Sequence, residues 1–199
     1  MSEPRIGRVL VASMHQAIQD VLPNRIEFYE NWLSTSGLRE GTIGLAPLSA
    51  VLSFLRVEGD AYNQITAKAG EYAADWTVSG MPNLERRIIQ ALPESWRVRS
   101  ALRVARALVT TTYPGTRALT KLRGGKASVD LRGSLFCEVR EASVLPLCGF
   151  YAAAIARVLR HFSLPADVQV NECRGAGARK GCVLAVVLQR PAPEGPVAA

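Results

Sequence analysis

The sequence lacks the features that mark several common classes of protein. No apolar run approaches the roughly 20 residues that a helix needs to span a bilayer. There is no glycine-rich dinucleotide motif, no phosphate-binding loop and no nucleophile elbow. The segment 1–16 has no clear apolar region followed by a small-residue cleavage site, so we expect no signal peptide and a cytoplasmic protein.

Histidine and cysteine are scarce, with two and four residues respectively. In a reducing cytoplasm we expect the cysteines to be free thiols or metal ligands and not disulfides. They do not form a convincing array for an iron–sulfur cluster. Of the two histidines, His161 follows an apolar helical segment, a place typical of a cap or a surface residue.

Hydrophobic residues make up 48% of the chain and charged residues 21%, which predicts one compact globular domain. The net charge is +7, and the basic excess is concentrated in residues 85–140. A basic face suits phosphate, carboxylate or anionic lipid headgroups. The alternative, which the sequence favours, is a solvated arginine-rich surface. The basic residues are not interleaved with aromatic ones, so we expect no nucleic-acid partner.

Helical periodicity fills the first part of the chain. It predicts helices over residues 5–22, 24–34, 46–55, 60–78, 83–92 and 94–112. The clearest is 60–78, where apolar residues recur at steps of three and four before Gly80 and Pro82 end the helix.

The periodicity changes after residue 115. Residues 117–123 and 127–132 are predicted strands joined by Gly124 and Gly125, followed by a further strand over 134–140. An apolar helix over 148–162 and strands over 168–172 and 182–188 complete the pattern. The fold class is therefore α+β, with N-terminal helices packed against a small antiparallel sheet and one long helix. We expect a single domain over 1–190, with a helical half (1–115) and an α/β half (116–190), and a disordered proline-rich tail over 191–199.

Three segments between Val129 and Leu188 resemble the 4-vinyl reductase domain: DLRGSLFCEVRE, LPLCGFYAAAIARVL and VNECRGAGARKGCVLAVVL. Upstream, EYAADWTVSGMP and ALPESWRVRSALRVA are similar to the helical half of the family's bacteriochlorophyll-biosynthesis member. The resemblance implies a fold shared with subunits of the TRAPP tethering complex. It also implies a hydrophobic small-molecule ligand, such as a hydrocarbon or a tetrapyrrole intermediate, and a homodimer formed through the N-terminal helices.

The resemblance also implies a structural zinc ion, because phenol-sensing relatives hold zinc with three cysteines and a glutamate. By position the ligands here are Cys148, Glu172, Cys173 and Cys182. However, Glu172 and Cys173 are adjacent, and neighbouring strand side chains point to opposite faces. The last glycine-to-cysteine spacing, GARKGC, is one residue longer than in the family. Either the turn bulges to repair the geometry or the site is incomplete, and Cys137 is a candidate for a substitute ligand. The alternative, equally favoured, is that all four cysteines are small core residues.

Five aromatic residues are candidates for lining an apolar ligand pocket: Tyr72, Trp76, Trp96, Phe150 and Tyr151. Taken singly, each is more typical of a core-filling residue. The predicted function is binding or delivery of a small hydrophobic ligand. We expect no self-sufficient enzyme, because vinyl reduction needs a hydride or electron source and the sequence shows no site for one. Two alternatives stay open: an accessory subunit or enzyme in vinyl-group reduction of (bacterio)chlorophyll precursors, and a structural tethering protein.

Overall fold

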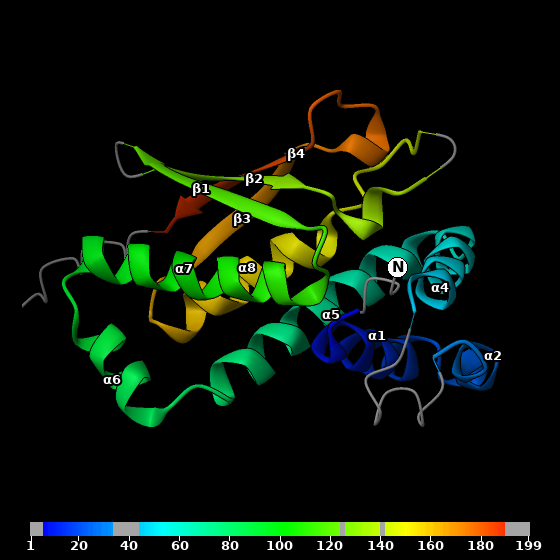
Figure 1. Cartoon of the computed structure of the whole chain (residues 1–199), viewed down its shortest axis with the longest axis horizontal. Helices are drawn as coiled ribbons and strands as arrows, with labels where there is room; N and C mark the ends of the chain where they lie inside the picture. Colours follow the sequence, from blue (N-terminus) through cyan, green and yellow to red (C-terminus); the bar gives the residue numbers. More distant parts are fainter. Residues whose placement is uncertain (1–5, 34–43, 124–125, 140–141, 190–199) are drawn as a thin grey trace, which may run out of the picture.

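A computed structural model describes residues 6–33, 44–123, 126–139 and 142–189. It confirms the predicted α+β class, with the helices of the first half followed by an antiparallel sheet and one further long helix (Figure 1). The Gly124-Gly125 turn and the tail over 191–199 lie outside the described residues. Within the described ranges, no helix combines the length and the hydropathy needed to cross a membrane.

The helices follow the predicted periodicity closely. They are α1 (Arg8–Val21), α2 (Ile26–Glu30), α4 (Leu45–Val57), α5 (Asp60–Ser79), α6 (Asn83–Ala91), α7 (Glu94–Thr112) and α8 (Gly149–His161). The largest departure is the predicted helix over 24–34, which is divided into a 3-10 turn, Pro23–Arg25, and the short α2. Pro23 accounts for the start of this turn, because its fixed φ suits a first helical position.

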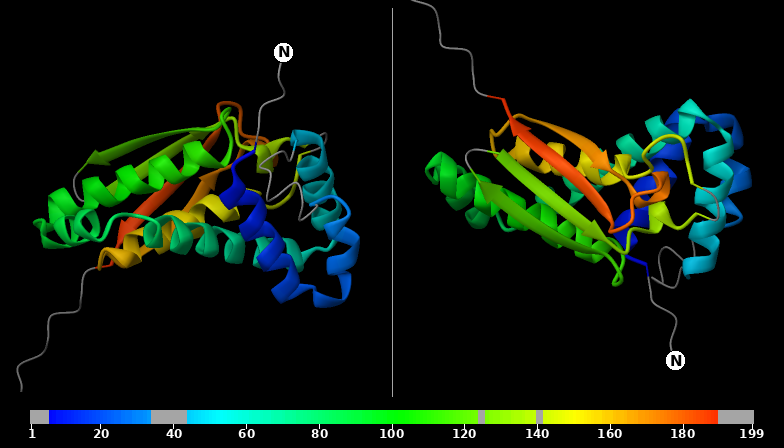
Figure 2. Two further views of the ribbon diagram at one scale, coloured as in Figure 1. Left: turned by 60° about the horizontal axis from the view of Figure 1, so that its bottom comes forward. Right: turned by 90° about the horizontal axis from the view of Figure 1, so that it is seen from above.

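The sheet contains β1 (Arg117–Arg123), β2 (Lys126–Arg132), β3 (Ala166–Glu172) and β4 (Cys182–Leu188). The strand order is β1-β2-β4-β3, and every neighbouring pair is antiparallel. Alternate residues of the central strands β2 and β4 are buried. Helix α7 contacts β1 and α8 contacts β3, so these helices cover one face, and the other face is seen from above in Figure 2.

Helix α5 packs against the side of α8 that faces away from the sheet, and α1 packs in turn against α5. The approach of α5 to α8 is close at Gly70, where an added Cβ would lie only 2.2 Å from the carbonyl oxygen of Phe150. Only glycine fits there without a shift of backbone. At the periphery, α6 lies at the opposite end of the molecule from α2 and α4 (Figure 1).

The strand predicted over 134–140 is wrong. The chain leaves β2 at Gly133, whose φ of +68° favours glycine, and Leu135–Cys137 forms a 3-10 turn, η2. The prediction rested on alternate residues sharing one face, but Leu135, Phe136 and Cys137 are buried consecutively. The turn places Cys137 in the interior, beside the other three cysteines.

A candidate metal centre and an adjoining cavity

The four cysteines, which come from separate segments, meet at one corner of the α/β half. Cys137 ends η2, Cys148 directly precedes α8, Cys173 follows β3 and Cys182 begins β4. All four Sγ atoms lie within 4.8 Å of one another. The Sγ atom of Cys137 is 3.0 Å from that of Cys148, 3.3 Å from that of Cys182 and 3.4 Å from that of Cys173. We call this group the cysteine cluster.

The cysteine cluster is screened from solvent. The exposed fractions are 6% for Cys137, 4% for Cys173 and 0% for Cys148 and Cys182. Two backbone amides point at sulfur: Leu147 N–H donates to Cys173 Sγ at 3.3 Å, and Arg174 N–H donates to Cys182 Sγ at 3.3 Å. Hydrogen bonds of this kind favour the thiolate form, and they hold the ligand atoms in position as outer-shell contacts do in metal sites.

Hydrogen bonds among the four thiols raise the pKa of two of them and lower the pKa of the other two. The hydrogen bond with Cys137 is the main cause that raises the pKa of Cys148 and of Cys182 and lowers the pKa of Cys173. The hydrogen bond with Cys148 is the main cause that lowers the pKa of Cys137. Four buried thiols in mutual contact therefore cannot ionise independently.

Four close, buried cysteines can bind a metal. The group contains no histidine or carboxylate, so its donors are all sulfur. Such a donor set is typical of tetrahedral zinc and iron sites. Four sulfur ligands would complete a tetrahedral coordination sphere and leave no position for a catalytic water, so a bound ion would be structural. It would join η2, the start of α8 and both sides of the β3–β4 connection.

The structure brings together three of the four ligands inferred by resemblance, Cys148, Cys173 and Cys182, and leaves Glu172 outside. Glu172 is exposed and pairs with Val183, after a register shift between Val170 and Glu172. Cys173, the next residue, is buried. The bulge does not turn Glu172 inward, and Cys137 occupies the fourth position instead.

An apolar cavity of about 370 Å³ lies beside the cysteine cluster. One wall comes from the segment between Cys137 and Cys148, through Val139, Ser143, Val144, Leu145 and Leu147. The opposite wall comes from the end of α4 and the start of α5, including Arg56, Asp60 and Tyr62. The Tyr62 hydroxyl donates to the carbonyl of Leu147 at 3.2 Å, which joins the two walls.

One polar atom at this cavity has no partner. Arg56 Nη2 donates to the carbonyl of Phe136 at 3.0 Å, but Arg56 Nε is buried without a hydrogen bond. A buried donor without an acceptor costs about 1–3 kcal/mol.

The five aromatic candidates occupy three different environments. Phe150 and Tyr151 are fully buried; Phe150 stacks on Phe136, and Tyr151 packs edge to face with both rings. Tyr72 and Trp76 stack on each other on α5, with Trp76 40% exposed. Trp96 is 59% exposed on α7, with the Arg99 guanidinium 5.8 Å from its ring centre. None of the five lines the cavity beside the cysteine cluster.

No family model matches the chain, and no curated protein matches it. Among solved structures, the chain is similar to a double variant of an H-NOX domain, with 11% sequence identity and a TM-score of 0.43. That alignment covers 96% of this chain and 98% of the other. A TM-score this low indicates a loose likeness, so the site is interpreted from its own residues.

Proposed function

We propose that the chain is a small-molecule-binding protein whose cavity is shaped by a structural zinc ion. The observation that carries the proposal is that Cys137 and Cys148 bracket the segment that forms one wall of the apolar cavity. A metal bound to both cysteines closes this segment into a loop, which we call the metal loop (residues 137–148). The zinc ion is the group that the all-sulfur, closed donor set suits best.

Loop closure explains why the metal matters to the cavity. In the part of the metal loop that the structure describes, Ser143 N–H donates to the carbonyl of Gly175 at 2.6 Å, and the carbonyl of Leu147 accepts from the Tyr62 hydroxyl. Two apolar side chains between these points are solvated, with Val144 96% exposed and Leu145 54% exposed. Binding of the metal at both ends restricts the loop and places these side chains opposite α5.

The lining indicates the class of ligand. The cavity volume falls in the range of about 300–1,000 Å³ that is typical of small-molecule sites. Val139, Val144, Leu145 and Leu147 supply an apolar surface. This lining supports a small hydrophobic molecule. The tetrapyrrole intermediate and the vinyl-reducing pathway suggested by the family resemblance stay predictions.

The metal is tested by comparing native and denatured masses of the untagged protein, with elemental analysis of the bound ion. We expect one zinc ion per chain in the native protein and in Glu172→Gln. Cys137→Ser should bind zinc much more weakly, because it removes one of four thiolates. Retention of zinc by Cys137→Ser together with its loss in Glu172→Gln would support the ligand set inferred by resemblance. A bare polypeptide mass after refolding with zinc would refute the metal centre, and bound iron would correct the identity of the ion.

The ligand site is tested with N-phenyl-1-naphthylamine, a neutral apolar dye that fluoresces when it is removed from water. Leu145→Glu places a carboxylate in the cavity lining and should weaken dye binding by about tenfold, since charge is excluded from an apolar site. The matched control is Val187→Glu, which introduces the same charge at a residue of similar exposure on β4. Equal effects of the two variants, or no binding by the unmodified protein, would contradict the proposal. Loss of binding in Trp76→Ala alone would move the ligand to the aromatic residues of α5.

A further inference from the structure

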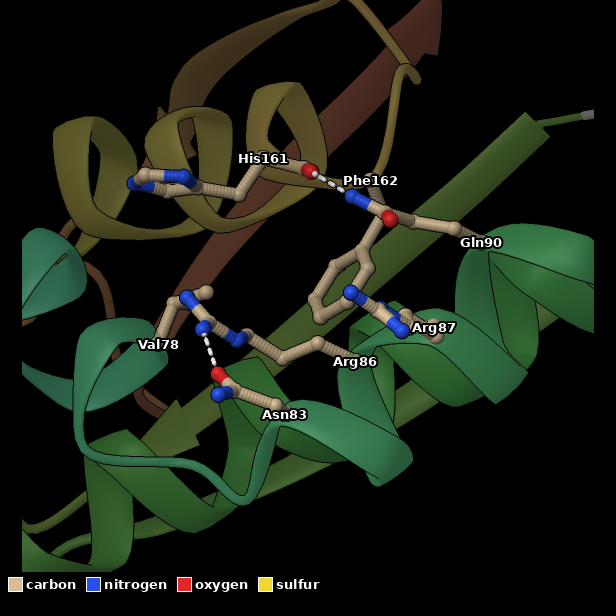
Figure 3. Close-up of a pocket in the computed structure, with 7 residues that line it drawn as sticks. All are labelled: Val78, Asn83, Arg86, Arg87, Gln90, His161 and Phe162. Carbon is tan, nitrogen blue, oxygen red and sulfur yellow. Dashed lines mark hydrogen bonds between the residues drawn. The ribbon is translucent and has the colours of Figure 1, made fainter.

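A second cavity, far along α8 from the cysteine cluster, lies between α6 and the end of α8. Its volume is about 280 Å³. Helix α6 contributes Asn83, Arg86, Arg87 and Gln90, and the end of α8 contributes His161 and Phe162 (Figure 3). Gln90 Nε2 donates to the carbonyl of His161 at 3.4 Å, which connects the two helices across the cavity. We call this cavity the basic cleft.

The two arginines of the basic cleft are not neutralised. Among the residues that the structure describes, neither Arg86 nor Arg87 forms an ion pair. Arg86 donates a hydrogen bond to the Asn83 side-chain oxygen, which carries no charge. No aspartate or glutamate lines the cleft. Two positive charges therefore face the same small space without a counterion from the described chain.

The carboxylate behind the cleft is already paired. Asp75 on α5 accepts two hydrogen bonds from Arg157, at 2.7 and 3.1 Å, and its Oδ1 lies 2.6 Å from His161 Nε2. Arg157 thus balances the charge of Asp75, and Asp75 fixes the orientation of the His161 ring. Asp75 therefore does not neutralise the charges of Arg86 and Arg87.

The remaining walls of the basic cleft are apolar. Phe162 is 0% exposed and Val78 is 3% exposed. In Figure 3, Arg87 extends toward the ring of Phe162, and Arg86 extends toward Val78 at the end of α5. Apolar walls lower the local dielectric and strengthen the interaction of guanidinium groups with an anion.

We infer that the basic cleft binds a phosphate group. A phosphate monoester carries a charge of about −1.5 to −2 at neutral pH, which matches the two unpaired guanidinium charges. Arginine presents a planar fork of donors that suits phosphate oxygens. The side-chain amides of Asn83 and Gln90 add polar groups at the rim. This inference does not depend on the metal centre or on the apolar cavity.

Both a soluble ester and a lipid headgroup carry such a phosphate, and two probes distinguish these sources. The first is inorganic phosphate, measured by calorimetry and by amide shifts of α6 in NMR spectra. The second is binding to phosphatidylcholine vesicles with and without phosphatidylglycerol. The test variant is Arg86→Gln with Arg87→Gln. Its matched control is Arg117→Gln with Lys121→Gln, which removes the same charge from exposed positions on β1 outside the cleft.

We expect the cleft variant to bind phosphate at least about tenfold more weakly, because each lost charge-assisted hydrogen bond has an effect of this order. The control variant should bind as the unmodified protein does. If α6 shifts its packing in the double variant, Arg87→Gln alone, at an exposed position, should still weaken binding. Binding only to anionic vesicles, lost in the cleft variant and kept in the control, would support the same site with a lipid source. Equal losses in both variants, or no binding of either probe, would overturn the inference.

Discussion

The two ends of the α5–α8 pair are held together by different physical means. At the cysteine end, Gly70 lets α5 approach the backbone of Phe150, two residues after Cys148. The side chains there are mainly apolar or carry sulfur, and most are buried. At the other end, Asp75 joins Arg157 and His161 through charged hydrogen bonds that are about one-third exposed.

This difference indicates how each candidate site responds to change. The cysteine end depends on close packing around four buried thiols that could hold a cation, so we expect a single lost group to affect the whole corner. The cleft end depends on charges that water partly screens, so its changes should be smaller and dependent on pH. The two sites can therefore be perturbed separately, and the predictions below test that separation.

The largest effect should come from removing one thiol of the cysteine cluster. Cys148→Ser should lower the free energy of unfolding of the zinc-loaded protein by more than about 4 kcal/mol, as loss of a structural metal does. Guanidinium chloride unfolding, followed by circular dichroism, measures the change. A chelator should destabilise the unmodified protein strongly and Cys148→Ser little further. Equal stability of the unmodified protein with and without the chelator would contradict a structural ion.

The helical half was largely predictable because its signals are local. The segment 60–78 carries apolar residues at helical spacing over five turns, and α5 covers Asp60–Ser79. Gly80 and Pro82 marked its end correctly. The division of the helix predicted over 24–34 was missed because apolar periodicity does not show that Pro23 starts a separate 3-10 turn.

The cysteine cluster was only partly predictable, since it depends on side-chain direction in irregular segments. Strand alternation placed Cys137 on the apolar side of a strand, but the chain turns at Gly133 and η2 carries Cys137 inward. The spacing of Glu172 and Cys173 showed that the two cannot share a face, without showing which one is buried. The register shift beside Glu172 decides that, and it is a property of pairing with β4.

A second prediction tests how closely α5 and α8 pack at the cysteine end. Gly70→Ala should lower the free energy of unfolding by about 2–3 kcal/mol, because the new methyl group would meet the backbone of Phe150 and Ala154, which cannot move without shifting α8. The control is Gly149→Ala, whose Cβ would meet the Thr66 hydroxyl at 3.3 Å. Its cost should stay below about 1 kcal/mol, because a side chain can adjust. Thermal unfolding measures both changes. A similar loss of stability in the two variants would show that α5 can move away from α8 at little cost.

A third prediction concerns the charged end. Asp75→Asn should lower the free energy of unfolding by about 1 kcal/mol at neutral pH, the effect of a partly exposed ion pair. Burial alone would raise the pKa of Asp75, but the hydrogen bonds from Arg157 and His161 outweigh it and hold the pKa below its usual 3.8. Because the folded-state pKa is lowered, the stabilisation is present above the unfolded-state pKa and is lost as the pH falls through the folded-state pKa.

The measurement is therefore urea unfolding of both proteins from neutral pH to below pH 4. The stability difference between Asp75 and its asparagine variant should shrink in the acid range. A difference that stays constant over this range would mean that Asp75 acts through packing and not through charge. Zinc content should be unchanged in this variant, because the cysteine cluster lies at the other end of the α5–α8 pair.

The smallest effect is expected at Tyr72, which lies on α5 between the two ends and faces α1. Its hydroxyl donates to Asp20 and is the main cause that lowers the pKa of Asp20 to about 2, with help from Lys68 and Gln16 against the effect of burial. Tyr72→Phe should raise that pKa toward its usual 3.8 without reaching it, because Lys68, at 3.0 Å, and Gln16, at 3.1 Å, stay in contact. Carbon-13 NMR titration of the Asp20 carboxyl group measures the shift. Neither zinc content nor dye binding should change, since Tyr72 contacts neither the cysteine cluster nor the apolar cavity. A fall in dye affinity would instead return Tyr72 to the ligand site that its spacing with Trp76 first suggested.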